Sequence, residues 1–334
     1  MGQSKILITG GYGCIGAETT KWFLRNTDAS VVIGSRNVTI TRTQQVFDDV
    51  DTERLDAVSV DISSSDEVVD LLNRGSFTHV IHLAALQTPD CNADRNLGLQ
   101  VNLAGTQNIV EALKALEIPV QRFVFASSIA VYGPRASYPG SVVSSDAKPC
   151  PSGPYGIWKL AGEHLARLFF EETHVPTVCL RPAVLYGPGR DLGLTSSPTT
   201  AMKHVVSGLP YEIPFCSRQD YQFAPDVGAA TAMSAWEDFS GYGVYTLPSH
   251  TLTSQEVVDV IYRVAKDTLS ISVPDISVGS EEVPFICDLE CDDFLDQFRM
   301  VPHTPLAQGI ASTLSKFKSQ FDQGDLIVSS SQKH

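Results

Sequence analysis

The sequence lacks several features that would place the protein in a specialised class. Among its 334 residues there is no run of about 18 consecutive apolar residues, so we expect no segment that spans a membrane. Positive charge is scarce, because 24 Lys and Arg residues stand against 38 Asp and Glu residues, for a formal net charge of −14. Such a field repels nucleic acid and anionic membrane surfaces, and we expect neither as a partner.

Cysteine spacing and the start of the chain give no sign of a metalloprotein or a secreted protein. The seven cysteines are scattered, without a C-x-x-C pair or a histidine-paired ligand spacing. Cys287 and Cys291 are four residues apart, and we interpret them as reduced thiols rather than as metal ligands. The chain opens on the strand-like segment MGQSKILITG, which has no signal-peptide pattern, so we expect a cytoplasmic protein.

The first half of the sequence alternates short β-branched segments with amphipathic ones. This rhythm is typical of a parallel sheet covered by helices, and it predicts an α/β, doubly wound Rossmann fold. The predicted strands are 5–9, 30–34, 55–59, 79–83, 123–127 and 177–181, and the predicted helices are 17–25, 65–73, 97–116 and 156–172.

After Pro182 the rhythm breaks into loops rich in proline and glycine, with helices expected at 199–207, 253–267 and 305–320. We interpret this part as a smaller, mostly C-terminal substrate-binding lobe over the carboxyl ends of the strands, where open α/β sheets bind ligands. The predicted organisation is a dinucleotide-binding domain of residues 1–183 with 222–247, a lobe of 184–221 and 248–322, and a flexible tail of 323–334.

A glycine-rich segment, TGGYGCIG, follows the first predicted strand and opens a helix. Gly10 permits a tight turn, Gly13 lets the backbone approach a pyrophosphate, and Gly16 lets the helix pack closely on the strand. The helix N-terminus adds free amides and a positive dipole end. A glycine-rich turn can also serve packing alone, but its place between a strand and a helix favours dinucleotide binding.

The end of the second strand bears on the choice between NAD and NADP. An acidic residue there binds the ribose 2′-hydroxyl of NAD, whereas an arginine accommodates the 2′-phosphate of NADP. This chain has Ser35, Arg36 and Asn37 and no carboxylate, which favours NADP and leaves NAD as the alternative. The competing interpretation is that Arg36 is only a solvated surface residue.

Tyr155 and Lys159 lie one turn apart on one predicted helix face. A phenol is a weak base at neutral pH, and a neighbouring ammonium favours its ionised form, so this pair suits proton exchange during hydride transfer. Ser128 follows the carboxyl end of a predicted strand, where its hydroxyl can bond a substrate oxygen. Each feature also has a purely structural interpretation. Tyr155 and Lys159 could be a half-buried tyrosine beside a surface lysine, and Ser128 could be a helix cap.

The chain resembles a known family, the extended short-chain dehydrogenases/reductases with their NAD-dependent epimerase/dehydratase group. The resemblance covers about 230 residues and rests on motifs that occur in the family's order. These are TGGYGCIG (9–16), DI (61–62), VIHLAA (80–85), NLAGT (102–106), SSIAVYG (127–133), YGIWK (155–159), RPAVLYGPG (181–189) and YQFAPDV (221–227).

The resemblance implies roles for particular residues. It implies that Ser128, Tyr155 and Lys159 are the catalytic set, that Lys159 also bonds the nicotinamide ribose, and that Asn102 supports the active-site helix and its relay waters. Further cofactor contacts are implied for Tyr12, Cys14, Ile15, Asp61, Ile62, Leu83, Ala84, Ala85, Pro182 and Val184, beside the three glycines. It also implies a homodimer formed through the helices at 97–116 and 156–172.

Departures from the family pattern bear on the substrate. Family 4,6-dehydratases carry an Asp-Glu pair where this chain has Ile129 and Ala130, which argues against dehydration. Family epimerases bind a diphosphate through an Asn near position 184 and an Arg directly before the Asp at 220. This chain has Val184 and Gln219 at these positions, and its arginine, Arg218, lies one residue earlier.

These departures favour an NAD(P)-dependent carbonyl reductase or alcohol dehydrogenase acting on a small polar or sugar-like molecule. The alternatives are a sugar or nucleotide-sugar epimerase with tightly bound NAD, and a non-catalytic NADP-binding sensor. Besides Ser128, the residues expected to contact the substrate are Gln87, Ile129, Tyr186, Arg190, Thr195 and Phe223.

Overall fold

A seven-stranded parallel sheet forms the larger domain in a computed structural model that describes residues 3–269 and 273–328. The strand order is β10-β6-β5-β4-β1-β2-β3, with every neighbouring pair parallel. Its central strands are apolar on both faces, as a sheet buried on both sides requires. The strands are β1 Lys5–Thr9, β2 Ser30–Ser35, β3 Leu55–Ser59, β4 His79–His82, β5 Arg122–Ala126, β6 Thr177–Arg181 and β10 Tyr242–Thr246.

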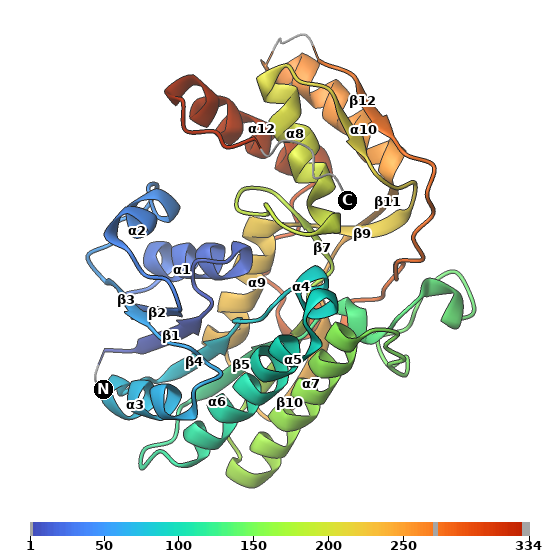
Figure 1. The fold of residues 1–334 in the computed structure, drawn as a ribbon. Helices are drawn as coiled ribbons and strands as arrows, with labels where there is room; N and C mark the ends of the chain where they lie inside the picture. Colours follow the sequence, from blue (N-terminus) through green and yellow to red (C-terminus); the bar gives the residue numbers. More distant parts are fainter. Residues whose placement is uncertain (1–2, 270–272, 329–334) are drawn as a thin grey trace.

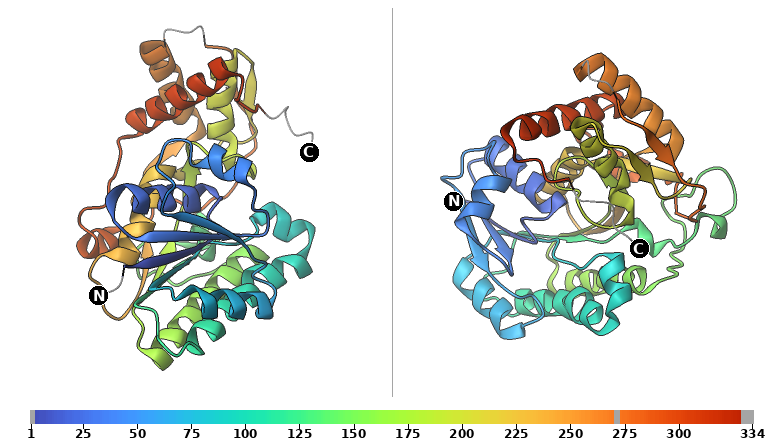
Figure 2. Two further views of the ribbon diagram at one scale, coloured as in Figure 1. Left: turned by 90° about the vertical axis from the view of Figure 1, so that its left-hand side faces the viewer. Right: turned by 45° about the horizontal axis from the view of Figure 1, so that its top comes forward.

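Helices cover both faces of this sheet (Figure 1; Figure 2, left). One face carries α1 (Cys14–Asn26), α2 (Ile40–Val46) and α9 (Ala224–Trp236), and the other carries α3 (Ser65–Gly75), α6 (Gly105–Lys114) and α7 (Pro154–Thr173). Each layer has its own buried apolar cluster against the sheet. The predicted doubly wound Rossmann fold is therefore confirmed.

Element boundaries depart from the predicted ones where local geometry changes. The helix expected at 97–116 is α5 (Arg95–Gly98), a π-helical segment (Leu99–Ala104) and α6. A π-turn inside a helix is uncommon and often accompanies a functional site. The remaining short elements near this domain are α4 Thr88–Ala93, the 3-10 turns Ile129–Val131 and Arg135–Ser137, and α11 Asp292–Gln297.

The second lobe lies over the carboxyl edge of the main sheet and has its own core (Figure 1). It contains a three-stranded sheet ordered β11-β9-β7 and a two-stranded sheet β12-β8, neither of which was predicted. The elements are β7 Val184–Tyr186, a 3-10 turn Leu194–Ser196, α8 Ser197–Ser207, β8 Tyr211–Ile213, β9 Arg218–Phe223, β11 His250–Thr253, α10 Ser254–Val264, a π-helical segment Ala265–Leu269, β12 Ile276–Val278 and α12 Leu306–Gln323.

The chain crosses between the two parts more than once. After β9 it returns to the Rossmann domain, where α9 packs on α1 and β10 pairs with β6. It then enters the lobe again at β11 (Figure 2, right). Of the tail expected at 323–334, residues 329–334 lie outside the described residues. In the part that the structure describes, no helix has the length and apolar character needed to cross a bilayer.

Candidate active site

A cavity of about 710 Å³ lies at the carboxyl edge of the main sheet, under the second lobe. Its walls come from the segments that follow β1, β2, β3, β4, β5 and β6, together with the start of α7. Because the strands are parallel, these segments meet at one edge, although they are separated by up to about half the chain. The cavity therefore collects the motifs that the sequence singled out.

The glycine loop after β1 is shaped to receive a phosphate group. Gly10 has a positive φ of 74°, and a Cβ there would approach the backbone N of Ala84 to 2.8 Å. A Cβ on Gly16 would collide with Gly10 O, whereas Gly13 faces open space apart from that same oxygen. The first helical hydrogen bond of α1 runs from Ala17 N–H to Gly13 O. Gly13 N–H bonds Gly10 O, so the amides of the first turn of α1 are the ones left for an anion, and they fit a dinucleotide pyrophosphate.

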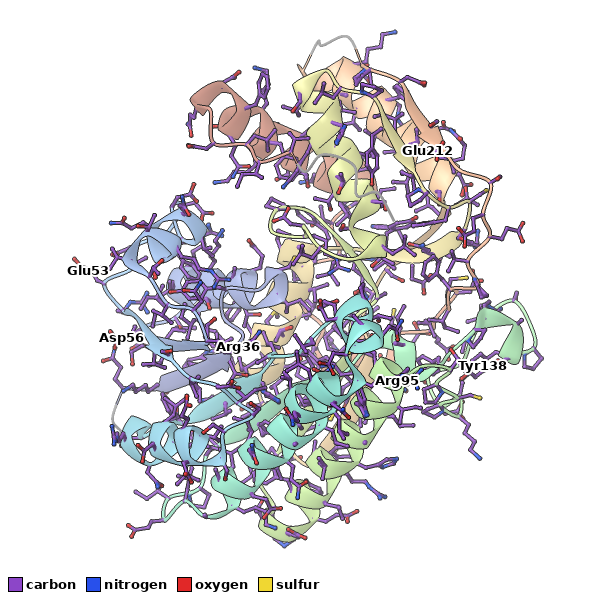
Figure 3. All side chains as sticks on the ribbon, in the orientation of Figure 1. Arg36, Glu53, Asp56, Arg95, Tyr138 and Glu212 are labelled. Carbon is purple, nitrogen blue, oxygen red and sulfur yellow. The ribbon has the colours of Figure 1, made fainter. Side chains whose placement is uncertain are left out.

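The adenosine end of the cavity is bordered by two arginines. Ser35 and Arg36 line it at the end of β2, where Figure 3 marks Arg36. Arg42 from α2 also lines it, with its guanidinium 4.5 Å from the centre of the Tyr12 ring. Across from them lies Asp61, whose pKa is lowered chiefly by its hydrogen bond from Ser63 and also by the charge of Arg36.

The predicted catalytic residues converge at the other end of the cavity. Ser128 follows β5, while Tyr155 and Lys159 lie in the first turns of α7, and all three line the cavity. Lys159 donates from Nζ to Ala126 O at 2.6 Å, and its Nζ is 5.8 Å from the centre of the Tyr155 ring. Ser128 also caps a 3-10 turn by accepting a hydrogen bond from Ala130 N–H. Its capping role and its place in the cavity are therefore compatible.

Burial changes the acidity of the Tyr-Lys pair. Burial raises the pKa of Tyr155 above its ordinary value, while the Ser128 hydroxyl and the Arg190 charge oppose that rise. Burial lowers the pKa of Lys159 to about 8, and the neighbouring Cys91 and Glu163 oppose that fall. Lys159 thus keeps its proton through most of the neutral range, and its positive charge favours the phenolate of Tyr155.

A buried ion pair fixes the catalytic helix to the sheet. Glu163, one turn after Lys159, accepts hydrogen bonds from Arg181 Nε at 2.8 Å and Nη2 at 2.7 Å, and another from Ser127 Oγ. Arg181 also donates to the Tyr132 hydroxyl at 2.7 Å. These contacts join α7 to the ends of β5 and β6, from which Ser128 and Pro182 enter the cavity.

Most of the residues singled out from the sequence line this cavity. On the cofactor side these are Gly10, Tyr12, Gly13, Cys14, Ile15, Gly16, Ser35, Arg36, Asp61, Ile62, Leu83, Ala84, Ala85, Pro182 and Val184. On the substrate side they are Gln87, Ser128, Ile129, Tyr155, Lys159, Arg190 and Thr195. Their individual roles remain predictions.

Four predicted residues are not in the cavity wall. Asn37 is exposed beyond the end of β2. Asn102 is buried behind the wall, where its side chain bonds both the N–H and the C=O of Leu86. Tyr186 and Phe223 stack at 5.5 Å in the core of the second lobe, because α12 brings Gly309 against both rings. The expectation that these two rings face a substrate is therefore not met by their placement.

Some lining residues were not found from the sequence. Arg42 was missed because the short helix α2, which has no buried residue, gives no amphipathic pattern. The apolar segment Val283–Ile286, here called the strap, also lines the cavity. It lies more than 90 residues after 181–189, the last family motif in the wall, and carries no recognisable motif itself. Its short run of apolar residues, VPFI, was the only signal.

The diphosphate grip expected of nucleotide-sugar enzymes has no counterpart in this wall. Arg218 is half exposed outside the cavity and donates to Asp288 from Nε at 3.1 Å and Nη2 at 2.9 Å. Gln219 is fully buried, and neither polar atom of its amide has a partner among the described residues. Neither side chain lines the cavity.

The profile of the NAD dependent epimerase/dehydratase family matches residues 6–241, which include the glycine loop, Ser128, Tyr155 and Lys159. The chain belongs to this family. It is therefore an enzyme of the extended short-chain dehydrogenase/reductase type, and the alternative of a non-catalytic sensor loses its support.

Curated relatives of this epimerase/dehydratase chain include two kinds of enzyme. A dTDP-glucose 4,6-dehydratase from Neisseria meningitidis is 29% identical over 196 residues, which are 55% of this chain and 54% of that enzyme. The chain thus spans about half the length of that relative. A D-erythronate dehydrogenase from Cupriavidus necator is 26% identical over 276 residues, covering 79% of this chain and 83% of the relative.

Solved structures of related proteins share the whole fold. MoeE5 in complex with UDP-glucose and NAD has a TM-score of 0.78 at 25% identity, covering 95% of this chain and 100% of that one. The UDP-glucuronic acid 4-epimerase from Bacillus cereus, with UDP-glucuronic acid and NAD, has a TM-score of 0.75 at 24% identity, covering 94% and 99%. Both hold NAD, so the expected preference for NADP gains no support from them.

Proposed function

We propose that this chain oxidises a secondary hydroxyl of a sugar-type substrate, with Tyr155 as the base. The observation that carries the proposal is the convergence of Ser128, Tyr155 and Lys159 in a cavity whose other end fits a dinucleotide. Family membership supports the same chemistry. A nicotinamide dinucleotide, when bound, accepts the hydride and can return it.

The residues of the chain handle the proton. Tyr155 as phenolate removes the hydroxyl proton while carbon loses its hydride, and it returns the proton when the reaction reverses. The Ser128 hydroxyl donates a hydrogen bond to the same substrate oxygen and fixes its distance from Tyr155. Lys159, held by Ala126 O, supplies a positive charge that stabilises the phenolate of Tyr155, whereas burial favours the neutral phenol.

We infer that the hydride returns to the same substrate, which makes the chain a sugar or nucleotide-sugar epimerase. The two solved structures, which hold NAD and a UDP-sugar, and a dTDP-L-rhamnose 4-epimerase from Burkholderia thailandensis among the relatives support this alternative better than a net reductase. Ile129 and Ala130, in place of the acidic pair of the dehydratases, leave no group in that position for an elimination step.

Net dehydrogenation is the second candidate, and a specific observation favours it. Arg218 is held outside the cavity by Asp288, and Gln219 is buried away from it, so neither can grip a diphosphate. The D-erythronate dehydrogenase, whose name indicates a small sugar acid as substrate, aligns over most of both chains.

One experiment separates these outcomes. The purified chain is given a large excess of NAD and a panel of sugars, sugar acids and nucleotide sugars, and products are followed by NMR and by the absorbance of reduced nicotinamide. Epimerisation predicts an isomerised product with no accumulated reduced cofactor. Net dehydrogenation predicts one reduced cofactor for each ketone formed, and that result would reject the epimerase.

We propose that the site takes NAD and, through Arg36 and Arg42, also accepts NADP. The two guanidiniums border the adenosine end, where a 2′-phosphate would lie. We expect Arg36→Ala to weaken NADP binding about tenfold and to leave NAD binding within about twofold, because a charged hydrogen bond contributes about 1.5 kcal/mol or more. Calorimetric titration of both cofactors checks this. An equal loss for both, or a wild-type chain that binds no NADP, would contradict the arginine assignment.

We also propose a homodimer. Leu97, Leu99, Ile157 and Leu168 are exposed large apolar side chains on α5, the π-helical segment that follows it and α7. Helix α4 and the π-helical segment pack on α7, and α5 packs on both of them, so these side chains belong to one helical layer. Covering them with a second copy removes apolar surface from water.

A further inference from the structure

The cavity carries an unusual charge for this acidic protein. Among the described residues that line it, Asp61 is the only carboxylate, and it lies at the adenosine end near Arg36. At the catalytic end the charged lining side chains are Lys159 and Arg190. In a chain of formal net charge −14, the substrate compartment is therefore positive. A compartment with this charge attracts and retains an anion.

Arg190 is the cation that remains free for a substrate. Lys159 is turned inward and donates to Ala126 O, whereas Arg190 lies on the segment that leaves β7 and borders Tyr155 closely enough for its charge to act on the phenol. Its backbone N–H bonds Gly187 O at 3.2 Å, and its Nη2 donates to Thr195 Oγ1 at 2.8 Å. These two contacts hold the side chain in place.

The guanidinium still has donors to offer. Arg190 Nε is buried and has no partner within residues 3–269 and 273–328. A buried donor without a partner is costly, and such groups in native proteins are usually satisfied by a ligand or water. Because Nε is closed to solvent, a carboxylate in the cavity would accept its charge-assisted hydrogen bond from the terminal nitrogens of the guanidinium.

We propose that Arg190 binds a carboxylate of the substrate, which makes the substrate a sugar acid whose hydroxyl lies at Ser128 and Tyr155. This inference rests on the proposed hydroxyl oxidation and names its substrate class. Arg190 then determines specificity, and Thr195 positions it.

A single carboxylate fits this end of the cavity better than a nucleoside diphosphate. In the part of the chain that the structure describes, Arg190 is the one arginine that lines the catalytic end, and the strap Val283–Ile286 adds apolar atoms rather than cations to the wall. Two arginines outside the cavity wall, Arg135 and Arg218, are both paired with Asp288. A diphosphate carries at least two negative charges, and Arg190 alone would pair with them.

The cofactor pyrophosphate is the competing anion, because Gly189 lies close to Cys14 in the glycine loop. The loop amides and the N-terminus of α1 already suit that group. The effect of Arg190 on cofactor binding therefore has to be measured beside its effect on the substrate.

The test compares wild type with Arg190→Gln by isothermal titration in saturating NAD. The ligands are sugar acids and the polyols with the same carbon chains. We expect the wild type to bind an acid at least about tenfold more tightly than its polyol, and Arg190→Gln to remove that difference, because a hydrogen bond to a charged group contributes roughly this factor. Arg218→Gln, the matched control outside the cavity, is expected to keep it.

The outcomes test the carboxylate site and the proposed oxidation separately. Equal binding of acids and polyols by the wild type, or a loss in Arg190→Gln that falls on NAD rather than on the acids, overturns the inference. An active wild type that turns over only neutral or nucleotide sugars overturns it too, while leaving the proposed oxidation intact. Binding of acids through Arg190 without isomerisation or net oxidation of any panel member rejects the proposed hydroxyl oxidation and leaves the carboxylate site standing.

Discussion

Glu163 and Arg181 are the residues that most tightly join the catalytic helix to the sheet. The pair is nearly inaccessible to water, with side chains 4% and 8% exposed. Breaking such a pair by removing one charge leaves the other buried without compensation. The catalytic residues therefore depend on a contact that takes no part in the reaction.

We expect Glu163→Gln to lower the free energy of unfolding by about 3 kcal/mol, because Arg181 would remain charged in the interior. Glu172→Gln is the matched control on the same helix, since Glu172 pairs with Lys114 on the surface. Its expected change is within about 0.5 kcal/mol. Urea denaturation of the three proteins measures both values, and equal stability of Glu163→Gln and the control would show that the buried pair is unimportant.

For single residues, the sequence predicted which ones lie at the carboxyl edge of the sheet better than it predicted which way their side chains point. Gly10, Ser128, Tyr155 and Lys159 could be placed because each stands at the end of a strand or the start of a helix, where only one edge of the sheet is available. Tyr186 could not, because whether its ring meets a substrate or a core depends on Gly309 in α12, far away in the chain.

The element that connects the site to the proposed dimer is α7. Its first turn carries Tyr155, and its exposed side carries Ile157 and Leu168, which are 51% and 44% exposed. Leu168 lies about three turns after Ile157 and is not part of the cavity wall. A substitution at Leu168 therefore tests the dimer contact without disturbing the site.

We expect the wild type to be a dimer and Leu168→Lys to be a monomer, because an ammonium would be buried in the apolar contact. Light scattering after size-exclusion chromatography gives the masses. Ile118→Lys is the control, since Ile118 is also exposed but follows α6 in a loop. A monomeric wild type, or a Leu168→Lys protein that stays dimeric, would reject this contact.

Elements with a strong period were predicted from the sequence, and short ones were not. Strands β1 and β6 have the predicted bounds because each is an apolar segment buried on both faces. Strand β3 also has its predicted bounds, although it lies at the edge of the sheet and is only partly buried. Strands β7, β8 and β12 have three residues each, too few to display an alternating pattern. The second lobe therefore appeared from the sequence only as loops and helices.

For the whole molecule, buried histidines make stability depend on pH. His82 is 1% exposed between Thr9 and Thr106, and burial, together with the charge of Lys159, lowers its pKa to about 3. The unfolded chain binds a proton near the ordinary value of 6.5, whereas the folded chain does not. This contribution to stability is thus complete above about pH 6.5 and is lost as the pH falls below it.

We expect His82→Gln to lose less stability than wild type on acidification. Between about pH 6.5 and 5.5 the wild-type free energy of unfolding should fall by about 1 kcal/mol more than that of the variant, because glutamine can bond both threonines without titrating. Urea unfolding at the two pH values gives the comparison. Parallel losses in both proteins would show that His82 is protonated in the folded state.

The central claim is that Tyr155 exchanges the proton during hydride transfer in this cavity. The most direct measurement is rapid mixing of NAD-loaded wild type and Tyr155→Phe with a substrate that the wild type oxidises, following reduced nicotinamide. Tyr12→Phe, at another tyrosine of the cavity wall, is the control. The account predicts a loss of about 100-fold or more in the rate for Tyr155→Phe with unchanged NAD affinity. A Tyr155→Phe rate within a few-fold of wild type would contradict it.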